Sequence, residues 1–290
     1  MTKNNPLGVF DSGIGGLTLV KEIMKLLPHE NIIYFGDIGR MPYGSKSPEI
    51  ISLYASQIIN FLKTKKVKFI LSACGTVSTV ILCENNNCEV DKSLILDNIT
   101  KKNINKFNIN LMGIVEASCA AAVKHTKNKK IGVIATETAV DSNRYEDIIK
   151  KIDPDIQVFQ KGCPLLAPMI ENRCVENNTY EFNNILKKYL SCLTKKNVDV
   201  IILGCTHYPV VKNLISKILP DIILIDPACE TIIKLKQKLI SLDLISTREE
   251  TGNYIFFVSD IPDNFVKNAE IFLGKKIKKN VYFVDILKKN

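Results

Sequence analysis

The sequence predicts an α/β protein made of two pseudo-symmetric, doubly wound lobes with mainly parallel sheets and an active site in the cleft between them. Three observations predict this class. Short runs of β-branched and aromatic residues alternate with longer amphipathic stretches, which is typical of a parallel sheet covered by helices. A length of 290 residues suits two lobes better than one core. The chain also matches itself when Cys74 is set on Cys205.

This internal match extends along a helix and a strand. It aligns Val67 with Val198 and Ile70 with Ile201, and in both copies a helix that ends in lysine precedes the apolar run. Two related lobes, each delivering a strand end to a shared cleft, would explain the match. Chance similarity between two buried strands is the alternative.

The expected elements follow in chain order from the local patterns. Strands are expected where apolar β-branched and aromatic residues cluster, at 7–10, 31–35, 68–73, 110–115, 130–135, 156–160, 198–203, 222–225, 254–258 and 281–284. Helices are expected where apolar residues recur with helical spacing, at 17–27, 48–63, 77–83, 118–124, 142–150, 179–195, 210–219 and 230–240. We expect residues 1–99 with 210–290 to form the first lobe, and residues 100–209 the second.

Composition excludes several classes of protein. A hydrophobic share of 46% and a charged share of 24% are typical of a soluble globular chain. The first residues contain no apolar stretch that could act as a signal peptide, and no apolar run approaches the ~18 residues that span a bilayer. We therefore expect a cytoplasmic protein without a membrane segment.

The net charge of +9 raises the question of nucleic-acid binding. The arginines that specific phosphate and base contacts favour are few, namely Arg40, Arg144, Arg173 and Arg248. The other basic residues are lysines spread along the chain. This pattern favours a solvated lysine surface over a nucleic-acid site.

Nine cysteines suggest neither a disulfide framework nor a metal site. A long chain without a signal peptide is not expected to depend on disulfides, and no Cys-x-x-Cys pair occurs. Cys83 and Cys88 flank a polar loop with no histidine nearby, so we expect no zinc there. We expect no bound metal.

A glycine-rich turn follows the first strand, in Phe10-Asp11-Ser12-Gly13-Ile14-Gly15-Gly16-Leu17. Backbone N–H groups in such a turn suit a carboxylate or a phosphate. A dinucleotide fingerprint is the tempting interpretation, because Asp37 ends the next strand at a plausible distance. However, the third glycine of that motif is replaced by Thr18, so we expect no nicotinamide cofactor.

Two cysteines stand at matching strand ends. Cys74 follows the strand at 68–73 and precedes a helix, whose dipole would favour its ionisation. Cys205 holds the equivalent place after the strand at 198–203, and His207 could relay its proton. A zinc site would lack further ligands, and a cysteine hydrolase would leave one thiol unexplained. Each cysteine taken alone could also be a small buried core residue.

Two matched thiols suit the inversion of a chiral carbon by proton transfer. That reaction needs a base on one face of the carbon and an acid on the other, with the roles exchanged in reverse. Such groups work best with a pKa near the working pH, which a modest downward shift would give a thiol. Because the Cα–H bond of an amino acid is a very weak acid, oriented donors must also stabilise the carbanion-like state.

Four segments in the expected order resemble the glutamate racemase family. They are Phe10-Asp11-Ser12-Gly13-Ile14-Gly15-Gly16-Leu17, Arg40-Met41-Pro42-Tyr43-Gly44-Ser45-Lys46-Ser47, Gly162-Cys163-Pro164-Leu165 through Glu171, and Gly204-Cys205-Thr206-His207-Tyr208-Pro209. They span most of the chain, and the combination of the second and fourth is specific. The resemblance implies a two-lobed α/β fold with the site between the lobes and no cofactor.

The resemblance also implies roles for individual residues. Cys74 would be the base for the D-enantiomer, assisted by Asp11, and Cys205 the base for the L-enantiomer, assisted by His207 and Glu171. Substrate binding is implied for Asp11, Ser12, Pro42, Tyr43, Gly44, Gly75, Thr76, Thr138 and Thr206. Taken singly, Pro42-Tyr43-Gly44 also fits a plain turn, Asp11 a helix cap and Glu171 a solvated helix residue.

Two departures from the family pattern concern binding. Ala73-Cys74-Gly75-Thr76 replaces the usual Ala-Cys-Asn-Thr, which removes an amide that helps to hold the substrate. Thr136-Glu137-Thr138-Ala139 replaces Thr-x-x-Thr, so the second hydroxyl is missing or displaced to Thr138. Racemisation is therefore better supported than glutamate as the substrate.

The resemblance predicts interconversion of L- and D-glutamate, supplying D-glutamate for peptidoglycan. Racemisation of another amino acid such as aspartate is the nearest alternative. A regulatory protein that has kept the fold and lost activity is another, since the family includes members reported to act on DNA gyrase. We expect an amino acid substrate and a homodimer, and neither a nucleic acid nor gyrase as a partner.

Overall fold

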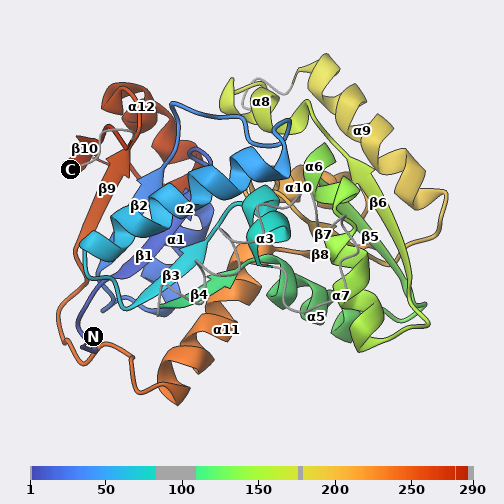
Figure 1. Ribbon diagram of the computed structural model, residues 1–290. Coiled ribbons are helices and arrows are strands. Elements are labelled where there is room, and N and C mark those ends of the chain that lie inside the picture. The colour runs from blue at the N-terminus through green and yellow to red at the C-terminus, as the bar shows by residue number, and fades with distance from the viewer. Residues whose placement is uncertain (1, 83–108, 176–178, 278, 287–290) are drawn as a thin grey trace.

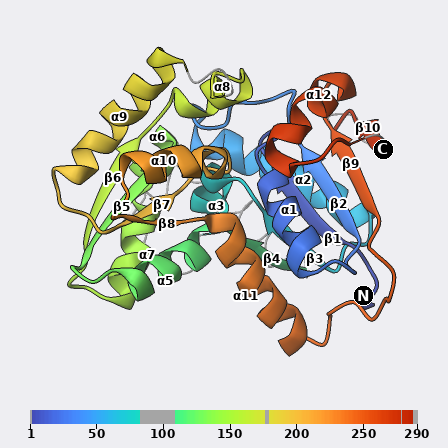
Figure 2. The same cartoon turned by 180° about the vertical axis from the view of Figure 1, so that it is seen from behind.

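A computed structural model describes residues 2–82, 109–175, 179–277 and 279–286, and it contains two parallel sheets (Figure 1). The six-stranded sheet has the order β10-β9-β2-β1-β3-β4, and the four-stranded sheet has the order β6-β5-β7-β8. We call each sheet with its covering helices the first and the second lobe. The lobes lie side by side, with α3 and α11 between them (Figures 1 and 2).

The strands match the sequence predictions closely. Those of the first lobe are β1 (Leu7–Asp11), β2 (Ile32–Gly36), β3 (Phe69–Ser72), β4 (Asn110–Gly113), β9 (Tyr254–Val258) and β10 (Val281–Phe283). Those of the second lobe are β5 (Lys130–Ala135), β6 (Gln157–Gly162), β7 (Val200–Leu203) and β8 (Ile223–Ile225). Each neighbouring pair is parallel. The predicted α/β class with parallel sheets in two lobes is confirmed.

The predicted lobe boundaries differ from the sheet pairing at two strands. β4 pairs with β3 in the first lobe, although residues 100–209 were expected in the second. β8 pairs with β7 in the second lobe, although residues 210–290 were expected in the first. The chain therefore changes sheet after β4 and again after β8, because each of these strands extends the sheet that the preceding strand belongs to. The boundary at 99/100 itself lies outside the described residues.

The helices also follow the predicted pattern, with local corrections. They are α1 (Leu17–Leu26), α2 (Pro48–Thr64), α3 (Gly75–Ile81), α5 (Val115–His125), α6 (Glu137–Asp141), α7 (Arg144–Ile152), α8 (Leu166–Glu171), α9 (Tyr180–Thr194), the 3-10 helix η1 (Tyr208–Val211), α10 (Lys212–Ile218), α11 (Pro227–Ser241) and α12 (Pro262–Leu273). The sequence prediction omitted α6, α8 and α12. Asn143, at φ 51°, separates α6 from α7.

Helix α3 begins two residues earlier than predicted, and this places a key residue. Cys74 has extended backbone and is the N-cap residue of the helix. The predicted end of this helix at residue 83, and Cys88 with it, lie outside the described residues. Side-chain caps fix other helix starts, for example Asp226, whose carboxylate accepts the Ala228 N–H at 2.9 Å at the start of α11.

The two lobes share one apolar core. Buried residues of β1, α1, α11, α5 and the second sheet form a continuous cluster. A separate cluster lies under α2 and α3 on the other face of the first sheet. Helix α11 packs against α1 of the first lobe and α5 of the second, so it joins the lobes on this side.

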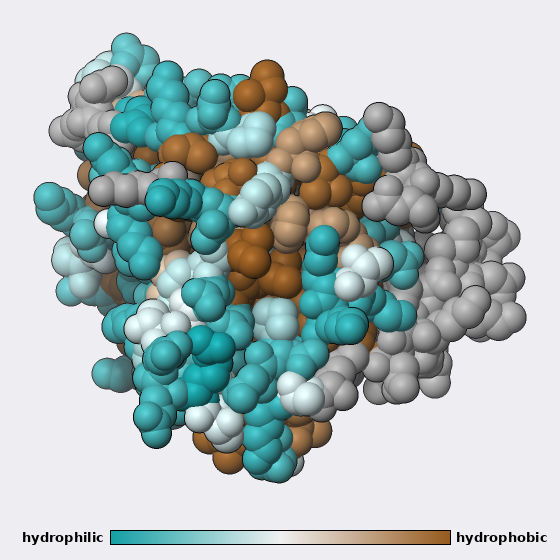
Figure 3. All heavy atoms as spheres, turned by 90° about the vertical axis from the view of Figure 1, so that its left-hand side faces the viewer, coloured by the Kyte–Doolittle hydropathy of each residue, from teal (hydrophilic) through white to brown (hydrophobic). Residues whose placement is uncertain are grey.

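The outer edge of the first sheet is formed by β10. Figure 3 looks onto this side of the molecule, where apolar side chains gather among polar ones. Phe283 on β10 is 57% exposed. Among the described residues, the helices are too short or too polar for a membrane crossing.

Candidate active site

The two cysteines singled out in the sequence lie at the carboxyl ends of strands in opposite lobes. Cys74 follows β3 and Cys205 follows β7, and both are buried, with 5% and 8% of their surface exposed. The loops that carry them meet: a Cβ atom built on Gly75 would lie 2.3 Å from the Gly204 carbonyl oxygen. The fold therefore brings together two loops that are far apart in the sequence.

Cys74 lies in a negative, buried environment. Its Sγ donates to Ser12 Oγ at 3.4 Å. Burial, the Asp11 carboxylate and Cys205 together raise the pKa of Cys74 to about 12, against the opposing effect of the Ser12 hydrogen bond. The downward shift expected from the helix dipole is thus wrong for Cys74, because desolvation and a neighbouring anion outweigh it. Cys74 is a thiol at neutral pH.

Asp11 ends β1 directly beneath the glycine-rich turn and is completely buried. Its Oδ2 accepts the Gly13 N–H at 3.1 Å, whereas Oδ1 has no hydrogen-bond partner among the described residues. Burial raises the pKa of Asp11, although His207 and the backbone of the turn oppose this shift. Gly16 permits the close packing, because a Cβ there would lie 2.6 Å from the Asp11 Cβ.

Cys205 lies beside a cation. His207 Nδ1 lies 3.7 Å from Cys205 Sγ, and Nε2 lies 2.6 Å from Glu171 Oε1 at the end of α8. Burial lowers the pKa of His207, but its hydrogen bonds to Cys205 and Glu171 outweigh burial and raise the value to about 10. His207 is therefore an imidazolium at neutral pH, and its positive charge lies beside the Cys205 sulfur.

The imidazole of His207 packs against two segments of the first lobe. The ring of Phe272 from α12 packs edge-on against it at 5.0 Å between centroids. Gly15 also lies against the ring, because a Cβ at this position would approach the ring to 2.6 Å and the Thr206 hydroxyl to 2.3 Å. The glycine-rich turn of the first lobe thus packs directly on the Cys205 loop of the second.

The Pro42-Tyr43-Gly44 segment is anchored by Asp37 at the end of β2. The Tyr43 hydroxyl donates to Asp37 Oδ2, and Arg40 Nε donates to the same oxygen at 2.7 Å. Ser259 Oγ, from the loop after β9, donates to Asp37 Oδ1 at 2.7 Å. Asp37 is completely buried. The carboxylate that made a dinucleotide fingerprint tempting therefore holds a loop of the site instead.

Hydroxyl groups of the second lobe reach across to the first. Thr138 Oγ1 donates to the Gly44 carbonyl at 2.8 Å, and Thr76 and Thr136 share a hydrogen bond of 2.9 Å between their hydroxyls. The displaced hydroxyl of Thr138 therefore lies at the cleft, while Ala139 is buried. Sequence reasoning missed Thr136 as a cleft residue, although its place at the end of β5 was a signal.

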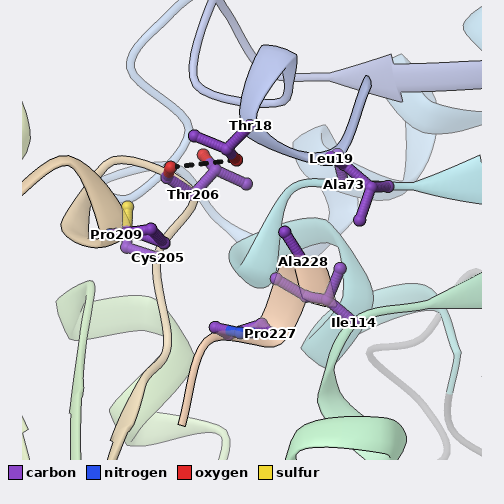
Figure 4. Close-up of a pocket in the computed structure, with 9 residues that line it drawn as sticks. All are labelled: Thr18, Leu19, Ala73, Ile114, Cys205, Thr206, Pro209, Pro227 and Ala228. Atoms are coloured by element: carbon purple, nitrogen blue, oxygen red, sulfur yellow. Dashed lines mark hydrogen bonds between the residues drawn. The ribbon is translucent and has the colours of Figure 1, made fainter. Parts of the chain in front are cut away.

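A small pocket lies between the lobes next to Cys205 (Figure 4). Its lining residues are Thr18, Leu19, Ala73, Ile114, Cys205, Thr206, Pro209, Pro227 and Ala228. Thr18, the residue that breaks the dinucleotide fingerprint, donates its hydroxyl to the Thr206 carbonyl at 3.3 Å. This bond is another direct link between the lobes.

Comparison with known proteins decides the family. The sequence model described as Asp/Glu/Hydantoin racemase matches residues 17–232. The chain belongs to the Asp/Glu/hydantoin racemase family. It is 40% identical to a glutamate racemase of Thermoanaerobacter pseudethanolicus over 98% of this chain and 99% of that one. A glutamate racemase of Neisseria meningitidis is 37% identical over 95% of each chain.

Solved structures agree with this assignment to the racemase family. The glutamate racemase of Francisella tularensis, in complex with D-glutamate, is 37% identical with a TM-score of 0.84, covering 98% of this chain and 99% of that one. A glutamate racemase isoform of Bacillus anthracis is 33% identical with a TM-score of 0.87, covering 99% and 100%. An aspartate racemase of Picrophilus torridus is 18% identical with a TM-score of 0.52, covering 80% and 94%, and shows the fold alone.

Within this racemase fold, the residues predicted for the site lie in segments where the two lobes meet. Those placed there by the contacts above are Asp11, Ser12, Tyr43, Gly44, Cys74, Gly75, Thr76, Thr138, Glu171, Cys205, Thr206 and His207, with Pro42 in the same loop as Tyr43. In the described parts of the chain, no group of three or more His, Cys, Asp or Glu side chains is arranged to hold a metal ion.

Proposed function

We propose that this chain is a glutamate racemase that interconverts L- and D-glutamate without a cofactor, by proton transfer between Cys74 and Cys205. The observation that carries the proposal is the pairing of two buried thiols at strand ends of opposite lobes, one beside an anion and the other beside a cation. The glutamate racemases that align over nearly the whole chain support the substrate.

The charges suggest the resting protonation state. Cys74 holds its proton, because its pKa is raised, and Cys205 is the base that faces the His207 imidazolium at 3.7 Å. With L-glutamate bound, Cys205 removes the Cα proton on one face and the electron pair remains on Cα. Cys74 then gives its proton to the opposite face, which produces D-glutamate. Cys205 is left as a thiol and Cys74 as a thiolate, and D-glutamate reacts through the same steps in reverse.

The carbanion-like state needs donors at the substrate carboxylate, and the cleft offers hydroxyl groups and backbone amides. We assign substrate binding to Asp11, Ser12, Pro42, Tyr43, Gly44, Gly75, Thr76, Thr138 and Thr206. Asp11 assists Cys74, and Glu171 acts on Cys205 through His207. Donors fixed in a buried site stabilise developing charge without reorganisation when the proton leaves.

Isotope exchange tests the proposal. Purified protein incubated with L-glutamate in D2O should incorporate deuterium at Cα and lose optical rotation. Cys74→Ser and Cys205→Ser should each abolish racemisation while keeping the parent's unfolding temperature. Cys192→Ser is a matched control, because Cys192 lies on α9, where its thiol donates a hydrogen bond to the Tyr189 carbonyl, and it is not one of the predicted site residues. Full racemase activity in either cleft variant would refute the two-thiol mechanism.

The same assay separates the rival substrate. Gly75 in place of the family's asparagine is the observation that favours another amino acid. A much faster reaction with L-aspartate would refute the glutamate assignment and leave the two-thiol chemistry intact. A supply of D-glutamate to peptidoglycan, a cytoplasmic location and a homodimer belong to the same proposal, and sedimentation of the purified protein tests the homodimer.

A further inference from the structure

The structure leaves no room for a side chain at Gly75. A Cβ at this position would lie 2.3 Å from the Gly204 carbonyl oxygen of the second lobe, which is far below a van der Waals contact. The obstacle is backbone, so a side-chain rotation cannot relieve it. Among the described glycines only Gly274 has a positive φ, so the backbone of Gly75 is open to any residue. The close approach of the lobes is therefore what requires a glycine here.

The carbonyl that meets Gly75 is fixed from the other side. The hydroxyl of Tyr145, at the start of α7, donates to the Gly204 carbonyl at 3.3 Å. Tyr145 is completely buried. A Cβ on Gly204 would approach this hydroxyl to 2.9 Å, so Gly204 must also lack a side chain. Cys74 and Cys205 are the neighbours of these two glycines in the sequence.

We propose that Gly75 sets how closely the two cysteine loops approach, and that Tyr145 is a positioning residue that holds the Cys205 loop at this contact. The proposal rests on the racemase function proposed above and deepens it. The space left by the family's asparagine is filled by the carbonyl oxygen of the opposite lobe. This chain has thus exchanged a side-chain amide for a direct contact between the lobes.

The exchange makes restoring asparagine harmful. If Gly75 had only lost an amide contact, Gly75→Asn would improve substrate binding. With the Gly204 carbonyl at 2.3 Å, any Cβ forces the loops apart by about 1.1 Å before they reach ordinary contact at 3.4 Å. A misplacement of ~1 Å in a catalytic arrangement costs on the order of 10²-fold in rate. Gly75→Ala and Gly75→Asn should both lose kcat by about that factor.

Thiol labelling gives a readout that does not depend on turnover. The substrate-free parent and variants are treated with iodoacetamide, and modification at Cys74 and Cys205 is followed by peptide mass spectrometry. Gly75→Ala and Gly75→Asn should speed the modification of both cysteines. Tyr145→Phe should speed it mainly at Cys205. Gly132→Ala is the matched control, because its new methyl group would meet only side chains within the second lobe, such as Ile201 at 3.0 Å.

Each outcome decides the proposal. Faster labelling with a loss of kcat in the Gly75 variants, and neither change in Gly132→Ala, supports it. A Gly75→Asn variant with a lower KM, unchanged kcat and the parent's labelling rate overturns it. Equal acceleration at both cysteines in Tyr145→Phe overturns the positioning role of Tyr145. Should the parent racemise no glutamate, the labelling arm still decides the lobe contact, so the two proposals fail separately.

Discussion

Removing the charge of Glu171 tests the electrostatics of the Cys205 side. Glu171→Gln keeps the size of the side chain but replaces the carboxylate 2.6 Å from His207 Nε2 with a neutral amide. A hydrogen bond to a charged group contributes about 1.5–3 kcal/mol, which corresponds to about one to two pH units. From the parent's value of about 10, the pKa of His207 should therefore fall to roughly 8–9.

The measurement is direct because the chain has only three histidines. Proton–carbon NMR of the imidazole Cε1–H groups, followed from pH 5 to 11, resolves His207 from His29 and His125. These two are exposed and serve as internal controls whose curves should coincide in parent and variant. A parent His207 that titrates at its ordinary value near 6.5 would refute the imidazolium assignment, and so would an unchanged midpoint in Glu171→Gln.

Three further predictions concern buried charges. Because the pKa of His207 is raised, its protonation contributes stability that is fully present below pH 6.5 and is lost as pH rises through 10. The free energy of unfolding, measured by urea denaturation, should therefore fall by an amount on the order of 5 kcal/mol over this range, and His207→Asn should abolish that fall. Asp11→Asn should lower the pKa of Cys74 and speed its alkylation at pH 9, because it removes the neighbouring anion; an unchanged rate would contradict this. Lys68→Met should lower the free energy of unfolding, measured by urea denaturation, by about 3–5 kcal/mol, because it leaves the buried Glu30 carboxylate without the ammonium group 2.6 Å away. The double variant with Glu30→Gln should recover part of this loss.

The strands and the positions of both cysteines could be predicted from the sequence, because both depend on local patterns. Apolar β-branched runs mark β3 and β7, and their ends mark Cys74 and Cys205. The assignment of β4 and β8 to sheets could not be predicted in this way. An apolar run fits either sheet, and only the pairing of β4 with β3 and of β8 with β7 decides between them.

The contacts that shape the site were hidden for the same reason. Asp37 made a dinucleotide fingerprint tempting because its spacing from the glycine-rich turn was suitable, but its partners include Ser259, which is 222 residues away. In the sequence, Thr18 only breaks the dinucleotide motif, whereas in the structure its hydroxyl donates a hydrogen bond to the carbonyl of Thr206, 188 residues away. Contacts at such separations leave no periodic signal in the sequence.

Thermodynamics limits what the asymmetry of the two cysteines can do. L- and D-glutamate have equal free energies in solution, so the equilibrium constant is one, and kcat/KM must be equal in the two directions. The asymmetry proposed for Cys74 and Cys205 therefore cannot favour one product. The asymmetry can shift kcat and KM together, because in the proposed mechanism L-glutamate reacts with the resting form of the site and D-glutamate with the form that has the proton on the other cysteine.

This constraint gives a sharp kinetic prediction for Glu171→Gln. In the proposed mechanism, weakening the imidazolium beside Cys205 raises the free energy of the resting form, so the two protonation states of the site come closer in free energy. The ratio of KM for D-glutamate to KM for L-glutamate should move toward one, and the ratio of the two kcat values should move with it. Initial rates followed by circular dichroism in both directions measure these ratios. Ratios that stay at the parent's values would show that His207 and Glu171 do not set the resting position of the proton.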